Sequence, residues 1–444
     1  MNTRTETLLS TRILVFAVPI LAAIGVWLAI QFGWEIVAGA FTLFFFVIVA
    51  FIDARFLIIS IMLVFTLNQT TLVGGTQFMQ IARWFVLGVG ALYAIVHIFL
   101  RMASRKSGFV DIAAFIFLFY CFISIIYSSD SSLSFQRSVS LFFLYMTIFW
   151  TVWDYTNFKG IDSVIKTILI SAILVYILGG GFAFFPGAWQ SDGRFRGIMP
   201  NPNAFGLITA IYAPLLIWAW VKYKSWISLI VFVIAIIGLV FSGSRNGLLS
   251  VSIALIYLFF HIKLHRLLFV GLIFMSVIIA IFAFAGIDTL SINVPVIDRL
   301  INNNGNLDYT SGRLDAWISV LDQIQARPLY GYGFGIDALG FSEVSTVETT
   351  GVHNSYLSIT YQLGLTGLLL FIIPILALLF ISIRNTRNSG RLLLDHILQA
   401  VVLSGLVAAL FETWPLSPGN AFTFPFWTCV MLLVRQLTIQ KHNI

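Results

Sequence analysis

Charged residues are scarce in this sequence, at 10% of the chain, whereas hydrophobic residues make up 59%. A water-soluble protein could not bury so much apolar surface, so soluble classes are excluded and no nucleic-acid partner is expected. The only cysteines, Cys121 and Cys429, lie inside apolar runs, where we expect them to pack rather than to form a disulfide or bind metal. No convincing small-residue cleavage site follows the first apolar run, which we therefore expect to remain as a helix.

Long apolar runs are abundant, and many reach the length of about 17–25 residues that lets a helix cross a bilayer. They do not alternate polar and apolar residues, as the strands of a membrane barrel would. The sequence therefore predicts an all-α, polytopic transmembrane helical bundle of about 12–14 helices. The predicted spans are 13–31, 36–52, 55–70, 82–100, 110–128, 136–153, 162–184, 204–221, 226–242, 247–262, 267–287, 353–383, 392–412 and 421–436. The count falls to twelve if the short ones (36–52 with 55–70, and those within 226–262) form hairpins or partial crossings.

One connection is much longer than the others, and it divides the chain into four predicted parts. Residues 1–190 hold the N-terminal transmembrane helices, and residues 191–287 hold core helices with arginine-bearing outer loops. Residues 288–352 form a polar loop on the outer side, with amphipathic helical structure. Residues 353–444 form the C-terminal transmembrane helices.

Basic residues predict the orientation of the chain. With fourteen crossings, the N-terminus, the tail after Arg435 and the segments 101–108, 222–224, 263–266 and 384–391 all fall on one side. Basic loops mark the cytoplasmic side of a membrane protein. Both termini are therefore predicted to be cytoplasmic.

Lysine is absent from the predicted outer side, because all seven lysines map to the inner one. The outer basic residues are all arginine: Arg83, Arg137, Arg194, Arg196, Arg245, Arg299, Arg313 and Arg327. Arginine presents a rigid fork of donors that grips phosphate or carboxylate with two hydrogen bonds. The outer side is therefore a candidate binding site for an oxyanion, in particular a phosphate.

The segment "DGRFRGIMPNPNAFG" (192–206) places two arginines before a proline- and asparagine-rich turn. We expect Asn203 to cap a helix that starts at Ala204, so that Arg194 and Arg196 lie beside a helix N-terminus, which also attracts anions. Of the two, Arg196 is the one expected to touch phosphate. The alternative is that both reach lipid headgroups or pair with Asp192.

The segment "FSGSRNGLLS" (241–250) is predicted to be a tight turn between two apolar runs. Arg245 would then lie close to membrane depth. Inserting an arginine at the centre of a bilayer costs about 2.5–3.5 kcal/mol on insertion scales. Such residues usually have a partner or a function. The alternative is an ordinary hairpin turn whose arginine reaches out to the headgroups.

The segment "SGRLDAWISVLDQIQARPLYGYGFG" (311–335) predicts an amphipathic helix that ends at Pro328. Its apolar face is expected to comprise Leu314, Trp317, Ile318, Leu321 and Ile324. Arg313 lies in the first turn, where the helix dipole disfavours a positive charge, so a nearby anion would stabilise it. The alternative is pairing with Asp308 or Asp315. The glycines that follow are no nucleotide fingerprint, because no strand–turn–helix unit surrounds them.

The segment "VHNSYLSITYQLGLTG" (352–367) contains His353, the only histidine on the predicted outer side. A lone histidine is usually structural, but this one shares a compartment with the arginines and can act as a general base near neutral pH. Asn354 and Tyr356 are neighbouring candidates. The competing carboxylates are Asp337, Glu343, Glu348 and Glu412. No histidine cluster or paired-carboxylate motif indicates a metal.

These four segments together resemble the O-antigen ligase and Wzy-type polymerase family, over roughly residues 190–370. The resemblance implies a membrane glycosyltransferase of the GT-C type that is metal-independent and has no cofactor. It implies an undecaprenyl-pyrophosphate-linked glycan as the donor, used at the periplasmic face of the bacterial inner membrane. The acceptor would be lipid A core in a ligase, or another lipid-linked glycan in a polymerase.

The resemblance also implies roles for particular residues. Arg196 and Arg313, with Arg194 and Arg245, would bind the pyrophosphate, and His353 would activate the acceptor hydroxyl. The secondary candidates are Asn203, Asn354, Tyr356, Glu348 and Glu412. A ligase is the leading hypothesis and a polymerase the nearest alternative. A transporter or flippase of an anionic solute is disfavoured because the charges gather at one face and no internal repeat is visible.

Overall fold

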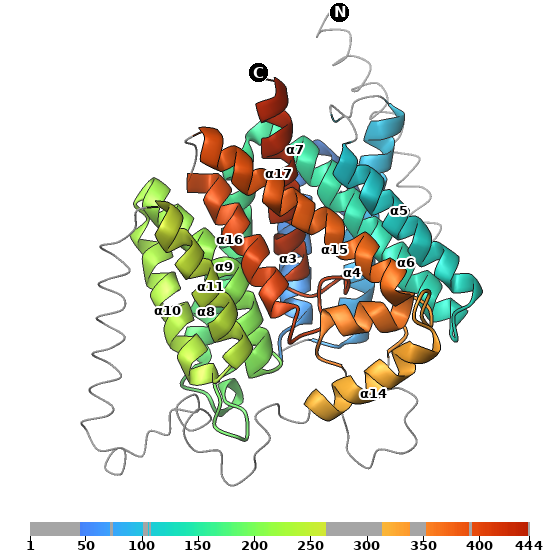
Figure 1. Cartoon of the computed structure of the whole chain (residues 1–444). Helices are drawn as coiled ribbons and strands as arrows, with labels where there is room; N and C mark the ends of the chain where they lie inside the picture. The colour runs from blue at the N-terminus through green and yellow to red at the C-terminus, as the bar shows by residue number, and fades with distance from the viewer. Residues whose placement is uncertain are drawn as a thin grey trace, which may run out of the picture. The chain divides into compact units, whose positions relative to one another are not determined.

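The computed structural model describes residues 45–71, 74–100, 105, 108–262, 313–337, 352–389 and 393–442. The helical structure of these residues confirms the predicted all-α polytopic membrane fold (Figure 1). The α-helices are α3 (Ala54–Asn68), α4 (Gln77–Phe99), α5 (Phe109–Ile123), α6 (Ser131–Met146), α7 (Trp153–Lys159), α8 (Ile161–Phe182), α9 (Pro202–Tyr223), α10 (Trp226–Ser242), α11 (Arg245–Ile262), α14 (Arg313–Ala326), α15 (Ser355–Ser389), α16 (Leu393–Ala408) and α17 (Thr423–His442). The chain forms two compact units, Met1–Leu57 and Ile58–Ile444, and the site described below lies in the second.

The predicted spans within the described residues coincide closely with these helices. The span predicted at 136–153 covers α6, a π-helical turn (Thr147–Val152) and the start of α7. The spans predicted at 13–31 and 267–287 lie outside the described residues, and of the span predicted at 36–52 only residues 45–52 are described. Five described stretches are long and apolar enough to cross a membrane: Gln77–Phe99, Phe109–Ile126, Ile161–Gly179, Pro202–Tyr223 and Ser355–Thr386.

Side-chain caps begin several of the helices. Asp130 accepts a hydrogen bond from the backbone N–H of Leu133 at α6, and Thr76 and Ser225 do the same at α4 and α10. Such caps satisfy backbone donors that have no partner within the helix. At α9 the cap is Asn201, whose side chain accepts from Ala204, and Pro202 occupies the first turn. The prediction that Asn203 caps this helix was wrong by two residues.

Helix α9 is the most deeply buried of the five membrane-length stretches. In its most apolar window 83% of residues are buried, against 33–50% in the others. Its sequence is apolar on all sides, which is typical of a helix surrounded by other helices. Helices α8, α10, α11 and α16 surround it, while α4, α5 and α6 pack on the other side of α15 and α17 (Figure 1).

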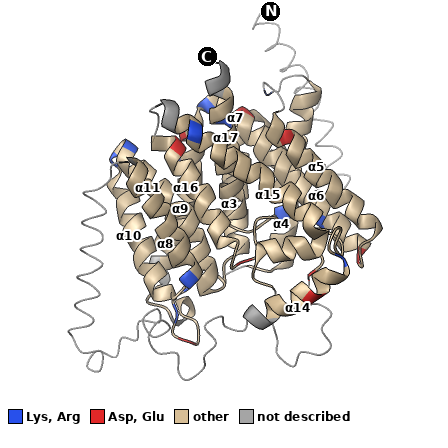
Figure 2. Ribbon diagram, viewed as in Figure 1, with Lys and Arg blue, Asp and Glu red and all other residues tan. Residues whose placement is uncertain are grey.

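Most of the charged residues lie toward the two ends of this bundle, and few lie along the helices between them (Figure 2). At one end Lys222 contacts Asp162, Arg435 binds Asn157, and the rings of His261 and His396 lie 4.9 Å apart. The turns that carry the outer arginines, and the 409–422 loop between α16 and α17, lie at the opposite end. The predicted sorting of the basic residues therefore agrees with the fold, although the assignment of the two ends to compartments stays a prediction.

Helix α14 is amphipathic, but its buried face differs from the predicted one. Ala316, Val320 and Ile324 are buried, whereas Ile318 and Leu321 are 51% and 46% exposed. Val320 and Ile324 pack with Ile336, Val352 and Tyr361, which lie before and within α15. The helical pattern alone could not separate these two overlapping faces, because α14 is apolar around more than half of its circumference. The helix thus packs against the segment that enters α15.

Candidate active site

A histidine and a carboxylate that are far apart in the sequence meet at the arginine-bearing end of the bundle. His353 Nδ1 lies 3.0 Å from Glu412 Oε2. His353 immediately precedes the start of α15, and Glu412 lies in the 409–422 loop. The backbone N–H of Ser355 donates to the carbonyl of Ala409, and the Ser355 hydroxyl donates to the carbonyl of Glu412. These bonds fix the two segments together, so the pairing of the side chains is supported by backbone contacts.

The backbone of His353 has a left-handed conformation, with φ of 46°. A non-glycine residue there costs about 1–3 kcal/mol, and such strain is concentrated at functional sites. The neighbouring residues hold it in place. The Asn354 side chain caps α15 by accepting from the N–H groups of Tyr356 and Leu357, and Trp317 of α14 donates to the carbonyl of Val352. Strain at a candidate catalytic histidine supports a functional role.

The arrangement defines what the imidazole can do. An ionised carboxylate only accepts hydrogen bonds, so in the neutral imidazole the pairing places the proton on Nδ1 and makes Nε2 the basic nitrogen. The side chains of His353 and Glu412 are 31% and 15% exposed, so the pair is partly accessible. A histidine base oriented by a carboxylate is a recurrent arrangement for activating a hydroxyl. Of the competing carboxylates, the structure brings Glu412 to the histidine.

A polar cavity lies beside this pair, with an empty volume of about 670 Å³. Ser355, two residues after His353, and Thr413, the residue after Glu412, both line it. Arg137 of α6 and Asp337 supply its charged groups. The other lining residues are Phe334, Gly335, Ser358, Ile359, Gln362, Trp414, Pro415, Leu416 and Ser417. The cavity is therefore rich in groups that can bind hydroxyls and anions.

The glycine-rich turn after α14 builds one wall of this cavity. Helix α15 is kinked at Gly364, which has φ of 67°. Backbone carbonyls of α15 just before the kink accept hydrogen bonds from backbone N–H groups of the turn. Tyr332 donates to the carbonyl of Tyr361, and Gly333 donates to that of Gln362. A Cβ at Gly364 would lie 2.2 Å from the carbonyl carbon of Leu329, so only glycine permits this approach. Gly364 thus serves the close packing of two backbone segments.

The loop before α9 is tied to the turn between α10 and α11 by Arg194. This side chain is buried, and its Nε donates to the carbonyl of Ser242 at 2.7 Å, while Nη2 donates to Asn203 Oδ1 at 3.1 Å. Its Nη1 lies 3.9 Å from Asp192, so the expected alternative partner is also near. Arg194 therefore holds two outer segments together.

The next arginine is more accessible. Arg196 donates from Nε to the carbonyl of Gly187 and from Nη1 to that of Pro200. Both partners are neutral carbonyls, so the positive charge of the guanidinium is not cancelled by these two bonds.

The turn that carries Arg245 lies beside the segment that leads to Glu412. Arg245 is the first residue of α11, and the side chain of the next residue, Asn246, donates to the carbonyl of Ala408 at the end of α16. Glycines Gly206 and Gly247 let α9 and α11 approach closely at this end. The bonds of Arg194 to Ser242 and of Asn246 to Ala408 therefore connect the predicted segments 192–206 and 241–250 to the end of α16, which leads to Glu412.

Comparison with known families identifies the central part of the chain. Residues 230–372 match the model of the O-antigen ligase family. The match covers about a third of the chain, and it is the part that is similar to O-antigen ligases. It comprises most of α10, all of α11 and α14, and the first part of α15, and so includes Arg245, Arg313 and His353. A search of curated proteins gave no match.

The family match supports membrane glycan transfer of the O-antigen ligase or polymerase type, on lipid-linked glycan substrates. It agrees with the resemblance inferred from the four motifs. Glu412 lies outside the matched region, and no local motif distinguishes it from the other outer carboxylates. Its role becomes visible only through its contact with His353.

The remaining predicted residues have varied surroundings. Asn203 accepts from Arg194, Asn354 caps α15, and the Tyr356 hydroxyl donates to the carbonyl of Leu406, so each has a structural partner. Arg313 begins α14, but its side chain lies outside the described residues, as do Glu343 and Glu348 entirely. Arg137, which lines the polar cavity, was predicted on the outer side but not as part of the site.

Proposed function

We propose that this protein transfers a glycan from undecaprenyl pyrophosphate to a sugar hydroxyl of lipid A core, as an O-antigen ligase. The observation that supports this most is the His353–Glu412 pair beside a polar cavity, at the end of the bundle where arginines gather. The histidine lies within the region that matches the O-antigen ligase family. The proposal places this end at the periplasmic face of the bacterial inner membrane, with both termini in the cytoplasm.

In the proposed reaction, His353 Nε2 takes the proton of the acceptor hydroxyl as the oxygen forms a bond to the anomeric carbon of the donor. The bond from that carbon to the pyrophosphate oxygen breaks, and the pyrophosphate leaves with the electron pair. Glu412 keeps the imidazole oriented and stabilises the imidazolium that forms. A positioned base of this kind contributes about 10²–10⁴-fold in rate.

Arginines would stabilise the charge that develops on the leaving pyrophosphate. We propose Arg196, Arg245 and Arg313 for this role. Arg196 supports it best, because within the described residues its bonds go to neutral carbonyls and leave Nη2 available. Arg194 is assigned instead to holding the loop, since its guanidinium is buried against Ser242 and Asn203.

Deletion of the encoding gene, followed by analysis of surface glycans, tests the proposal. Lipid A core without its glycan, together with intact lipid-linked polymer, would identify a ligase. Surface glycans limited to single repeats would identify a polymerase, the alternative that uses the same chemistry on a lipid-linked acceptor. Unchanged surface and lipid-linked glycans would contradict both.

Cysteine labelling tests the orientation independently. Single cysteines at Ser191 and Gly305 should react with a membrane-impermeant reagent added from the periplasmic side. Labelling of both from the cytoplasmic side alone would place the proposed site in the wrong compartment and contradict the proposed use of a periplasmic donor.

A further inference from the structure

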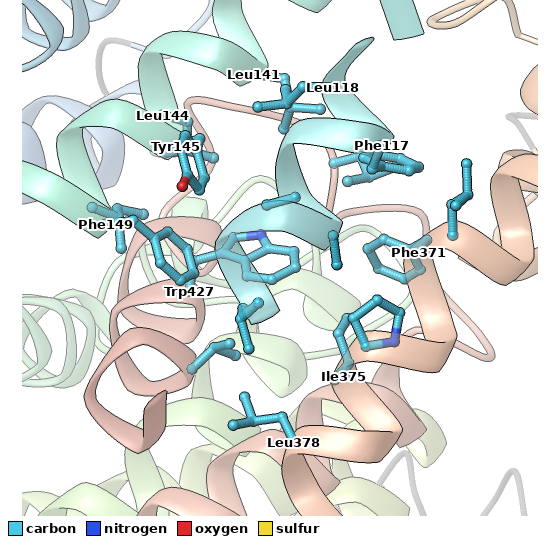
Figure 3. A pocket seen from close by; sticks show the side chains of 18 residues that line it. Phe117, Leu118, Leu141, Leu144, Tyr145, Phe149, Phe371, Ile375, Leu378 and Trp427 are labelled. Atoms are coloured by element: carbon cyan, nitrogen blue, oxygen red, sulfur yellow. The ribbon is translucent and has the colours of Figure 1, made fainter. Parts of the chain in front are cut away.

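An apolar cavity, of about 690 Å³ of empty space, lies among α5, α6, α15 and α17 (Figure 3). Tyr145 and Trp427 are the lining residues with polar side-chain atoms, and both atoms already have partners. The Tyr145 hydroxyl donates to Asp111, and Trp427 Nε1 donates to the carbonyl of Pro415. The cavity therefore presents no group that would select a ligand by its chemistry. More specific ligand groups lie on α11 and α16, at the end opposite the outer arginines.

Two histidines that are far apart in the sequence meet at this end of the bundle. His261 lies in the last turn of α11 and His396 in the first turn of α16, and their ring centres are 4.9 Å apart. Two imidazoles whose nitrogens each lie about 2.0–2.1 Å from one metal ion have ring centres about 5 Å apart in a tetrahedral site. The observed separation therefore fits two ligands of a single ion.

Hydrogen bonds at Nδ1 determine the tautomer of both rings. His261 Nδ1 lies 2.8 Å from the backbone carbonyl of Tyr257, which can only accept. His396 Nδ1 lies 3.2 Å from Gln399 Oε1. In the neutral state both rings therefore carry their proton on Nδ1, and the lone pair of Nε2 is available. Metal-binding histidines almost always use their other ring nitrogen in such a hydrogen bond, which orients the ring.

The amide of Gln399 is oriented by its own partners. Its Nε2 donates to the Ser382 hydroxyl at 2.7 Å and to the Thr386 hydroxyl at 3.0 Å. Thr386 gives its own proton to the carbonyl of Ser382, so it can only accept from Gln399. Oε1 is therefore the amide atom beside His396, and the Tyr257 hydroxyl donates to the same oxygen. The network thus decides where the proton of His396 lies.

A buried carboxyl group lies close to the two rings. Asp395, the neighbour of His396, is 1% exposed, and neither of its carboxyl oxygens has a hydrogen-bond partner within the described residues. It lies within electrostatic reach of Tyr257, on which the His261 ring stacks at 4.2 Å. Burying a carboxylate without a partner is costly. A divalent cation at the two histidines would stabilise its ionised form.

We propose that the Nε2 atoms of His261 and His396 bind one Zn²⁺ ion, which holds the end of α11 to the start of α16. Imidazole nitrogen is a preferred ligand of Zn²⁺. The described residues hold no group of three or more histidine, cysteine, aspartate or glutamate side chains suited to a metal, so water completes the coordination.

The position of the ion gives it a structural role. Helices α11 and α16 pack against each other, and at their other ends α11 begins with Arg245 and α16 leads to Glu412. The ion would therefore fix one end of the two helices whose opposite ends contribute to the candidate active site. The proposal concerns metal binding and does not rest on the proposed glycan transfer.

Zinc titration of the purified full-length protein tests the proposal. The protein carries no histidine tag and is first treated with a chelator, after which equilibrium dialysis and thermal unfolding follow the binding of Zn²⁺. We expect one ion per chain at saturation and an unfolding temperature that rises as the site fills. Mg²⁺, which prefers oxygen ligands, should leave the unfolding temperature unchanged. An unfolding temperature that does not respond to Zn²⁺ would contradict the proposal.

Variants then assign the ion to its ligands. His261→Ala and His396→Ala should each weaken Zn²⁺ binding at least about tenfold, as the loss of a metal ligand costs at least as much as the loss of a residue that orients it. His97→Ala is the matched control, because its ring also stacks on a tyrosine one turn earlier, Tyr93, but lies beside Asp154 rather than a second histidine.

The outcome of these variants is decisive. His261 is exposed, so His261→Ala should fold like the wild type and stays informative even if His396→Ala is unstable. Wild-type affinity in His261→Ala, or an equal loss in His97→Ala, would overturn the proposal.

Hydrogen exchange tests the link between the helices. Zn²⁺ should slow amide exchange in the last turn of α11 and the first turn of α16, and this slowing should be lost in His261→Ala. Zinc that binds without slowing exchange in either helix would be an adventitious surface ion and would contradict the proposal. None of these measurements uses glycan transfer, so failure of the proposed function would leave their outcome unchanged.

Discussion

The basic side chains at the two ends of the bundle have different partners. At the lysine-bearing end, Lys222 contacts Asp162 at 2.5 Å, so a cation meets a carboxylate. At the other end, Arg196 binds two backbone carbonyls. Paired charges cancel, whereas a guanidinium held by neutral carbonyls keeps its charge while its position is fixed. The end where carbonyls hold the guanidinium can therefore bind an anionic ligand.

The largest expected effect lies at the histidine. His353→Ala should reduce the rate of glycan transfer about 10²–10⁴-fold, because it removes the proposed base. The protein should still insert and fold, since the residue is partly exposed and Asn354 retains the helix cap. Transfer by membranes with equal amounts of each protein measures this. Full activity in the variant would exclude His353 as the base.

Glu412→Gln should have a smaller effect. The glutamine retains the size of the side chain and can still accept from Nδ1, but it loses the charge that stabilises the imidazolium. A hydrogen bond to a charged group contributes about 1.5–3 kcal/mol, which corresponds to a loss of roughly tenfold to 100-fold in kcat. Steady-state kinetics with the same donor and acceptor provide the measurement. A variant with wild-type kcat would reduce Glu412 to a packing residue.

Arg196→Lys and Arg194→Lys should affect different properties, namely substrate binding in the first case and folding stability in the second. Lysine keeps the charge but lacks the fork, so Arg196→Lys, and Arg313→Lys likewise, should lower transfer about tenfold with little change in unfolding temperature. Arg194→Lys should instead destabilise the fold by about 1–3 kcal/mol, because the buried carbonyl of Ser242 loses its partner. Activity and thermal unfolding are measured in parallel. Lysine variants of Arg196 and Arg313 that both match the wild type would contradict a bidentate phosphate clamp.

The smallest effect is expected at the lysine-bearing end. Lys222→Ala removes an ion pair whose side chains are 39% and 42% exposed, and exposed pairs contribute about 0–1 kcal/mol. Transfer should therefore stay at the wild-type rate, and the unfolding temperature should move little. A loss of transfer comparable to that of Arg196→Lys would mean that the contrast between the two ends does not reflect function.

Much of the fold could be predicted from local pattern. Apolar runs of membrane length gave the helices, and the basic loops sorted the ends, because both signals depend on the composition of contiguous segments. The position of the α9 cap was missed, since two asparagines two residues apart are equivalent as caps until the backbone is known. The buried face of α14 was partly wrong because its pattern admits two faces, and packing against Ile336 and Val352 selects one of them.

The candidate site, too, could be predicted only in part from the sequence. The sequence by itself determined that His353 stands beside a membrane helix on the arginine-bearing side, because residue type and neighbouring segments carry that information. Only the tertiary structure decided that Glu412 is its partner, that Arg194 is used within the fold, and that Arg137 faces a cavity. These facts depend on contacts between segments far apart in the chain, and such contacts are set by how helices pack rather than by any local pattern.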